Sequence, residues 1–274
     1  MCGRFVITSS PDALRRLFNY PELPNFPPRY NVAPTQPVPV VLQDQGTRHF
    51  QLMRWGFLPA WVKDPKKFAL VINARSETVR DKPAFRNALK RRRCLLPADG
   101  YYEWQDRGGR KRPFFIYARD RGPIAFAGLA ETWIGPNGEE LDTVAIVTTA
   151  APPHLAELHS RVPVTIAPRD FPVWLDCAAF DVDEAMALLV PPREHEFAWH
   201  EVSTEVNRVA NDNAELIAPL AAGLALHAQA PAPEQPPSDV AAPQDADPAA
   251  TAKAAPKKRR ASAKPVDDAQ GELF

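Results

Sequence analysis

Residues 38–57, VPVVLQDQGTRHFQLMRWGF, are two apolar runs separated by the polar pair Gln45-Gly46. Two such runs around a short turn that ends in glycine predict a β-hairpin, because glycine readily adopts the positive φ that tight hairpin turns require. The runs RPFFIYA, GPIAFAGLAETW and TVAIVTTA are also rich in β-branched and aromatic residues, and Pro136-Asn137-Gly138 separates the last two. Strands therefore dominate the prediction.

Three short segments, PDALRRLF, KPAFRNALKRRR and DEAMALL, have the apolar spacing of helices. Ser10 precedes the first of them as an N-cap, with Pro11 at the first helical position. Few strands alternate with full-length helices, so a doubly wound parallel sheet is not expected. We predict an α+β domain with a mainly antiparallel, barrel-like β core and short peripheral helices.

Composition divides the chain of 274 residues into two parts. We expect residues 1–220 to form one folded domain, and residues 221–274, which are rich in Ala and Pro and poor in aromatic residues, to form a disordered tail. The basic cluster Lys257–Arg260 in this tail is compatible with nucleic-acid contact and with a solubilising role. Lys plus Arg and Asp plus Glu both number 33, so any basic surface must be local.

Three distant cysteines, an odd number, favour a reducing compartment over a disulfide framework. The chain has no Cys-x-x-Cys motif, no apolar run near the roughly 20 residues of a membrane span, and no signal-peptide pattern. We therefore expect a monomeric cytoplasmic protein that needs no metal and no cofactor and does not enter a membrane.

Several polar side chains lie where apolar segments end, a position from which a rigid scaffold can hold them in a cleft. Asn73 lies in VINARSET, Glu103 in LLPADGYYEWQ and His159 in ELHSRVPVTI. Taken singly, each has an ordinary structural explanation as a turn cap, an exposed carboxylate or a loop imidazole. Together with Cys2, directly after Met1, they supply a nucleophile, two acid–base groups and an orienting amide.

Removal of Met1 would leave Cys2 with an α-amine and a thiol on adjacent carbons. An α-amine with a pKa of about 7.7–8.0 is partly neutral near pH 7 and attacks an aldehyde to give an imine. The adjacent thiol then closes a five-membered thiazolidine ring, helped by its high effective concentration. This chemistry predicts covalent capture of a carbonyl substrate.

The segments MCGRF, YNVAPTQ, MRWGFLPAW, NARSET, FRNALKRRRCLLPADGYYEW and HSRVPV, in this order, resemble the SOS response-associated peptidase (SRAP) family of abasic-site shielding proteins. The resemblance implies a barrel-like fold, recognition of abasic sites in single-stranded DNA, and a DNA–protein crosslink in the DNA damage response. It also implies that Cys2 is the nucleophile, that Asn73 orients its amine, that Glu103 assists sugar-ring opening and imine formation, and that His159 transfers protons. Val162 occupies a position where the resemblance leads us to expect methionine. We expect this difference to alter the packing beneath His159 and to leave the catalytic roles unchanged.

Candidate DNA contacts follow from the positions of the proposed catalytic residues. Arg4, Arg75 and Arg161 each lie within two residues of one of them, so we expect these guanidinium groups to contact phosphates. Pro34 and Trp55 are candidates for stacking on bases beside the lesion. The basic run Ala88–Arg93 is either a solvated helix face or a further DNA contact, whereas Trp133 and Trp174 are expected in the core.

Three alternatives remain open. An N-terminal-nucleophile hydrolase of the glutaminase type also begins Met-Cys-Gly, but it requires an oxyanion-hole Asn-Gly, and Asn137-Gly138 fits a hairpin turn better. A self-processing or general cysteine peptidase would use Cys2, His159 and Glu103, in keeping with the family's name. A non-enzymatic DNA-binding module is disfavoured by the near-zero net charge and by the absence of helix-turn-helix and zinc patterns.

Overall fold

The hairpin expected at residues 38–57 is present in the computed structural model, which describes residues 2–220. It consists of β3 (Pro37–Asp44) and β4 (Thr47–Trp55), paired antiparallel with Asp44 opposite Thr47. The two turn residues, Gln45 and Gly46, have φ values of 46° and 80°, as the hairpin prediction requires.

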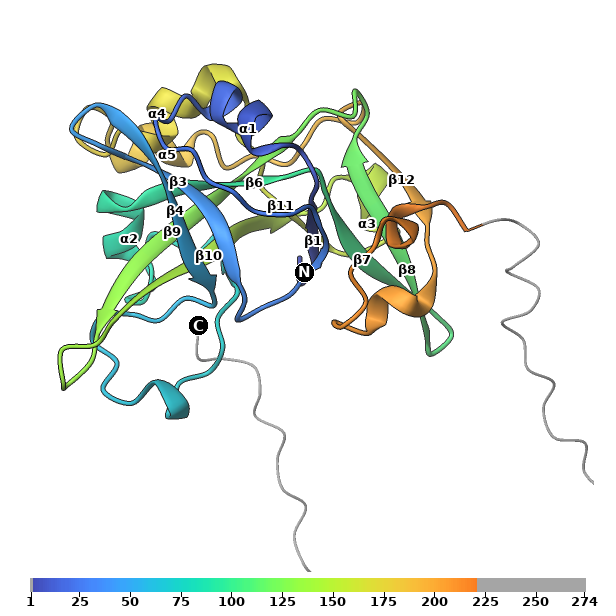
Figure 1. The fold of residues 1–274 in the computed structure, drawn as a ribbon, viewed down its shortest axis with the longest axis horizontal. Coiled ribbons are helices and arrows are strands. Elements are labelled where there is room, and N and C mark those ends of the chain that lie inside the picture. Colours follow the sequence, from blue (N-terminus) through green and yellow to red (C-terminus); the bar gives the residue numbers. More distant parts are fainter. Residues whose placement is uncertain (1, 221–274) are drawn as a thin grey trace, which may run out of the picture. The chain divides into compact units, whose positions relative to one another are not determined.

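This hairpin is part of a closed five-stranded barrel in which β10–β4–β3–β6–β9 returns to β10 (Figure 1). The other members are β6 (Arg93–Ala98), β9 (Ile124–Ile134) and β10 (Glu140–Ala150). All neighbours in the ring are antiparallel except β10 and β4, so the predicted mainly antiparallel barrel is confirmed. Alternating apolar side chains fill its interior, because inward-facing residues of a small barrel have no room for solvent.

A second sheet carries the amino-terminal strand. Its order is β12 (Phe197–Glu201), β8 (Arg110–Ala118), β7 (Gly100–Arg107), β1 (Phe5–Ile7) and β2 (Arg29–Val32). Strand β7 follows β6 after the single residue Asp99, whose carboxylate accepts hydrogen bonds from the backbone of Thr8 and Ser9 at 2.5 and 2.7 Å. The strand that follows Cys2 is therefore fixed against β7.

Two short strands extend the barrel sheet on β10. Strand β5 (Asn73–Arg75) is parallel to β10, and β11 (Arg161–Pro163) is antiparallel to it. Strand β5 carries the candidate Asn73, and His159 lies just before β11. Pairing with one barrel strand thus holds both segments.

The helices are short and peripheral, as expected. In α1 (Pro11–Phe18), the Ser10 hydroxyl accepts from the backbone of Ala13 at 3.2 Å, which confirms the predicted N-cap. The helix expected within KPAFRNALKRRR is α2, and it covers only Arg86–Arg91, because Arg93 already belongs to β6. The remaining helices are α3 (Pro153–Ala156), α4 (Phe171–Leu175), α5 (Val182–Met186), η1 (Pro65–Lys67), η2 (Pro168–Asp170), η3 (Thr204–Asn207) and η4 (Ala214–Ile217).

Two further predictions concern the core and the tail. Trp133 and Trp174 are buried, as expected. The predicted tail and its basic cluster at Lys257–Arg260 lie outside the described residues. Within residues 2–220, no helix has the length and apolar character needed to cross a membrane.

Candidate active site

Cys2 lies at the start of the chain segment that enters β1. Backbone pairing holds this segment, because the Arg4 carbonyl accepts from the Tyr102 backbone at 3.0 Å and Phe5 pairs with Tyr101 on β7. The Cys2 thiol is buried and points to the Arg4 carbonyl at 3.9 Å. Burial, with the nearby Glu103 carboxylate as a second cause, raises the pKa of the thiol. The sulfur is therefore a protonated thiol near neutral pH.

Asn73 contacts Cys2 directly from the first position of β5. Its Nδ2 donates to the Cys2 carbonyl at 3.0 Å. Its Oδ1 is buried and has no hydrogen-bond partner among the residues described. An acceptor in this state is costly to bury, so it marks a place for a donor beside the first residues of the chain.

Glu103 projects from β7, where it pairs with Phe114 on β8, and only 4% of it is exposed. Burial raises the pKa of its carboxyl, while the positive charge at the amino terminus acts in the opposite direction. A carboxyl group with a raised pKa keeps its proton closer to neutral pH and can serve as an acid.

His159 is held by the backbone just before β11. Its Nδ1 lies 3.0 Å from the backbone nitrogen and 3.3 Å from the carbonyl oxygen of Arg161, so the Arg161 backbone anchors this side of the imidazole ring. Burial, and secondly the charge at the amino terminus, lowers the pKa of this imidazole. At neutral pH the ring is therefore uncharged and able to accept a proton.

The four candidates thus come from β5, β7, the loop before β11 and the first residues of the chain, and a hydrogen bond and charge interactions link them. Cys2 contacts Asn73 and is influenced by the charge of Glu103, and the amino-terminal charge affects both Glu103 and His159. The set combines a thiol, an orienting amide, a buried acid and a neutral imidazole. Among residues 2–220, no group of three or more His, Cys, Asp and Glu side chains is arranged to hold a metal ion.

Two of the three expected phosphate-binding arginines are engaged with protein groups. Arg4 donates to Asn31 Oδ1 at 2.6 Å and to the Val206 carbonyl at 2.9 Å. Arg161 forms a two-pronged ion pair with Glu77 at 3.0 and 2.9 Å, and donates to the carbonyl of Thr148 at 2.6 Å. Both guanidinium groups therefore link segments that are distant in the sequence.

Arg75 differs from these two arginines because its side chain is exposed next to Asn73. Pro34 is half-buried in a turn whose next residue, Thr35, has a φ of 74°. The backbone N–H of Thr35 donates to the Trp55 carbonyl at 2.7 Å, which fixes this turn against the end of β4.

The expectation that Trp55 stacks on DNA bases is wrong. Trp55 is 0% exposed, its ring lies 5.2 Å from that of Phe5, and its indole N–H donates to the Ile72 carbonyl at 3.0 Å. Its position at the end of β4 turns the side chain into the core. An aromatic residue of a sheet reaches solvent only when its face of the sheet is uncovered.

Trp61, six residues after Trp55, is the exposed tryptophan of this segment, and the sequence analysis did not select it. It is 59% exposed and borders a concave surface of about 370 Å³ together with Lys63 and Lys67. Its ring contacts Phe68 edge-to-face at 5.8 Å. The alternation of aromatic and lysine residues in AWVKDPKKF was the available signal.

Asn31 is a second residue whose importance only the structure reveals. It is 1% exposed, and its Nδ2 lies 3.2, 3.0 and 2.8 Å from the carbonyls of Val206, Arg208 and Asn211. Its Oδ1 accepts from Arg4. Asn31 therefore joins the strand that follows Cys2 to the segment after β12, which explains the asparagine in YNVAPTQ.

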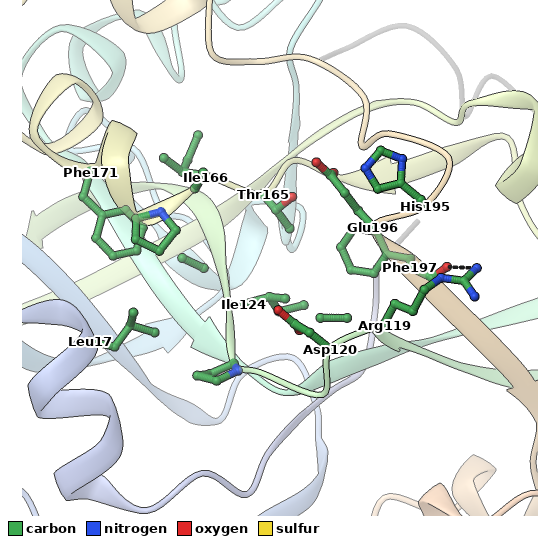
Figure 2. Close-up of a pocket in the computed structure, with 15 residues that line it drawn as sticks. Leu17, Arg119, Asp120, Ile124, Thr165, Ile166, Phe171, His195, Glu196 and Phe197 are labelled. Carbon is green, nitrogen blue, oxygen red and sulfur yellow. Dashed lines mark hydrogen bonds between the residues drawn. The ribbon is translucent and has the colours of Figure 1, made fainter.

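A cavity of about 580 Å³ lies elsewhere, between α1, the start of β9 and the start of β12. Figure 2 shows Phe171, Ile166 and Leu17 around it, with His195, Glu196, Asp120 and Arg119 on the opposite side. None of the four candidate catalytic residues lines this cavity. The candidate active site is therefore separate from it.

Fold and site together describe a class of protein: a β-barrel that holds a buried cysteine, Cys2, near an amide, a buried acid and a neutral imidazole. A family model described as SOS response associated peptidase (SRAP) matches residues 1–209. The chain belongs to this family.

Named relatives are similar over most of their length. The abasic site processing protein YoqW of Bacillus subtilis is 37% identical over 221 residues, which cover 79% of this chain and 99% of that protein. YedK of Escherichia coli is 33% identical over 228 residues, covering 80% of this chain and all of YedK, and HMCES of Gallus gallus is 33% identical over 268 residues, covering 82% and 79%. Both are also named abasic site processing proteins.

Solved structures share the fold. A protein from Bacteroides thetaiotaomicron superposes with a TM-score of 0.72 at 22% identity, covering 80% of this chain and 100% of that one. A phage-related protein from Bordetella bronchiseptica has a TM-score of 0.61 at 28% identity, covering 73% and 94%.

Proposed function

We propose that this protein captures abasic sites in single-stranded DNA by forming a thiazolidine with Cys2 after Met1 is removed. The relatives named as abasic site processing proteins support the substrate. The observation that carries the chemistry is Asn73, which holds the Cys2 carbonyl through Nδ2 while its buried Oδ1 offers an acceptor beside it. That acceptor suits the α-amine that loss of Met1 would create on Cys2.

The first step is addition of the neutral α-amine to the aldehyde carbon of the ring-opened sugar, giving a carbinolamine. Protonated Glu103 donates to the hydroxyl of this intermediate, which leaves as water when the imine forms. The raised pKa of Glu103 supports this role, because the acid form must persist near neutral pH. One water molecule leaves in this step, and no oxidant or reductant is needed.

The second step is attack of the Cys2 sulfur on the imine carbon. A new carbon–sulfur bond closes the ring, and the carbon–nitrogen double bond becomes single. The thiol proton passes to the nitrogen, with neutral His159 as the base that relays it. The lowered pKa of His159 supports this assignment, since a charged imidazolium cannot accept the proton.

Peptide hydrolysis is less well supported by the same site. A cysteine peptidase must attack an unactivated amide and depends on a thiolate, whereas ring closure is intramolecular on an imine that has already formed, and burial raises the pKa of the Cys2 thiol. The Asn137-Gly138 pair that a glutaminase-like oxyanion hole would require lies in the hairpin turn between β9 and β10, where Gly138 has a φ of 84°.

DNA contact in this proposal combines stacking with phosphate binding. Exposed Trp61 takes the stacking role first expected of Trp55, and Lys63 and Lys67 beside it attract the backbone. Exposed Arg75 follows Asn73 and contacts a phosphate near the lesion, with half-buried Pro34 beside the neighbouring base. Arg4 and Arg161 keep their hydrogen bonds to protein groups and so hold the backbone segments that carry the site.

The test uses a single-stranded oligonucleotide with one abasic site. Wild-type protein should form a heat-stable adduct on a denaturing gel, and intact-mass analysis should find Met1 removed. Cys2→Ala should form no stable adduct, and an oligonucleotide whose abasic aldehyde has been reduced should not react with either protein. Efficient crosslinking by Cys2→Ala without borohydride, or wild-type protein that reacts with Met1 still attached, would refute the proposal.

A further inference from the structure

Helix α2 carries more positive charge than folding can explain. Arg86, Lys90 and Arg91 are exposed on this six-residue helix, which contains no acidic residue, while Ala88 and Leu89 face the core. Arg86 and Lys90 are four residues apart on one side, a like-charge spacing that destabilises a helix. Within residues 2–220, none of these three side chains forms an ion pair.

The two arginines that follow α2, Arg92 and Arg93, form hydrogen bonds within the protein. Arg92 pairs with Glu131 at 3.1 Å and donates to the Thr132 hydroxyl at 2.7 Å. Arg93 is 1% exposed and donates to four backbone carbonyls, among them those of Trp174 at 2.6 Å and Phe180 at 2.9 Å. Of the basic run in the sequence, therefore, only the helical cations remain available to a partner.

The helix also borders a hollow. Asn87, Arg91, Arg92 and Glu131 line a concave surface of about 350 Å³. Glu131 is neutralised there by Arg92, so Arg91 is the unbalanced charge and Asn87 adds an amide donor. A guanidinium group and an amide donor suit a phosphate oxygen, which is anionic and accepts hydrogen bonds, better than a cationic ligand.

We propose that α2 is a second DNA-binding surface, which holds the sugar–phosphate backbone of the strand flanking the lesion. The inference rests on the proposed function, because it assigns this surface to the same DNA that reacts at Cys2. Figure 1 places α2 beside the barrel, apart from β7, which carries Glu103. Flanking DNA, and not the abasic sugar itself, is therefore its ligand.

The geometry sets how many phosphates the surface can hold. Five helical steps from Arg86 to Arg91 span about 7.5 Å. Phosphates of one strand rise about 3.4 Å per nucleotide in a duplex, so the helix spans about two nucleotide steps, and we count one phosphate contact for each step. Each contact contributes about 0.7–0.9 to the slope of log affinity against log salt concentration.

The test measures equilibrium binding to an oligonucleotide with a reduced, unreactive abasic site. The variant Arg86→Gln/Lys90→Gln/Arg91→Gln should lower the magnitude of the salt slope by about 1.4–1.8, so that the wild-type advantage shrinks about tenfold between roughly 50 and 200 mM salt. Its crosslinking rate at saturating DNA should stay at the wild-type value, because α2 takes no part in the chemistry. The charge-preserving variant Arg86→Lys/Arg91→Lys should retain the wild-type slope.

A matched control removes equal charge from exposed positions elsewhere, as Arg15→Gln/Arg16→Gln/Arg193→Gln. A salt slope unchanged in the α2 variant, or reduced as much in this control, would overturn the inference. The unreactive oligonucleotide separates this outcome from failure of the proposed function, which would appear as loss of crosslinking by wild-type protein. Thermal unfolding of each variant checks that all of them are folded.

Discussion

Replacing Trp55 or Trp61 with alanine should have opposite consequences, because one indole is in the core and the other is on the surface. Trp55 is fully buried against Phe5, whereas Trp61 is 59% exposed. Truncating a buried tryptophan costs about 3–5 kcal/mol. For a folded unit of this size that loss lowers the melting temperature by about 6–20 °C. Trp61→Ala should cost about 1 kcal/mol or less, mainly its ring contact with Phe68.

DNA binding should show the reverse order. Stacking of a base on an aromatic ring is worth about 1–3 kcal/mol, so Trp61→Ala should raise the Kd for single-stranded DNA roughly 5- to 160-fold. Trp55→Phe keeps an aromatic ring in the core and serves as the folded comparison if Trp55→Ala is too unstable. The Ile72 carbonyl still accepts from the Ile146 backbone at 3.0 Å, so this substitution leaves no unpaired acceptor.

Thermal unfolding and fluorescence anisotropy with an unreactive oligonucleotide measure the two effects separately. The reasoning fails if Trp61→Ala binds DNA as tightly as wild-type protein while Trp55→Phe, still folded, binds weakly. It also fails if Trp55→Ala melts within about 2 °C of wild-type protein, since a loss that small contradicts full burial.

Two further predictions concern buried polar groups. The raised pKa of Glu103 means that its contribution to stability is fully present below the unfolded pKa of about 4.3 and is lost as pH rises through the raised folded value. Glu103→Gln should therefore increase the free energy of unfolding in urea near pH 7 but not near pH 4. The same substitution should slow adduct formation by about 10²- to 10⁴-fold. Equal stability changes at both pH values would contradict the burial argument. Asn31→Ala removes the donor to three carbonyls and the acceptor for Arg4, which should cost about 2–4 kcal/mol in urea unfolding, and a loss below about 1 kcal/mol would show that this network is not stabilising. Asn31→Asp keeps the Arg4 contact but supplies no donor, so it should be destabilised as well.

Local rules in the sequence predicted much of the fold. The β3–β4 turn at Gln45-Gly46, the turn at Gly138 and the Ser10 cap each depend on residues close together in the chain. Such features follow from φ preferences and short-range hydrogen bonds, which do not require knowledge of distant segments. Closure of the barrel by β9–β10 pairing and the parallel β4–β10 contact depends on strands far apart, and no local signal specifies it.

The motifs also identified four residues that a hydrogen bond and charge interactions link in the structure. Cys2 and Asn73 are separated by 71 positions, yet they share a hydrogen bond because β5 pairs with β10 beside the amino-terminal segment. Their residue types and their place at the ends of apolar runs predicted candidate chemistry. Only the sheet pairing decided that they meet.

The sequence by itself determined the strand-rich class, the turns, the helix cap and the chemical set of thiol, amide, carboxyl and imidazole. Tertiary structure decided which tryptophan reaches solvent and which arginines are free, because Arg4 and Arg161 are bound by partners as distant as Val206 and Glu77. Exposure and charge pairing are properties of contacts between segments remote in the chain. Residue type alone does not contain them.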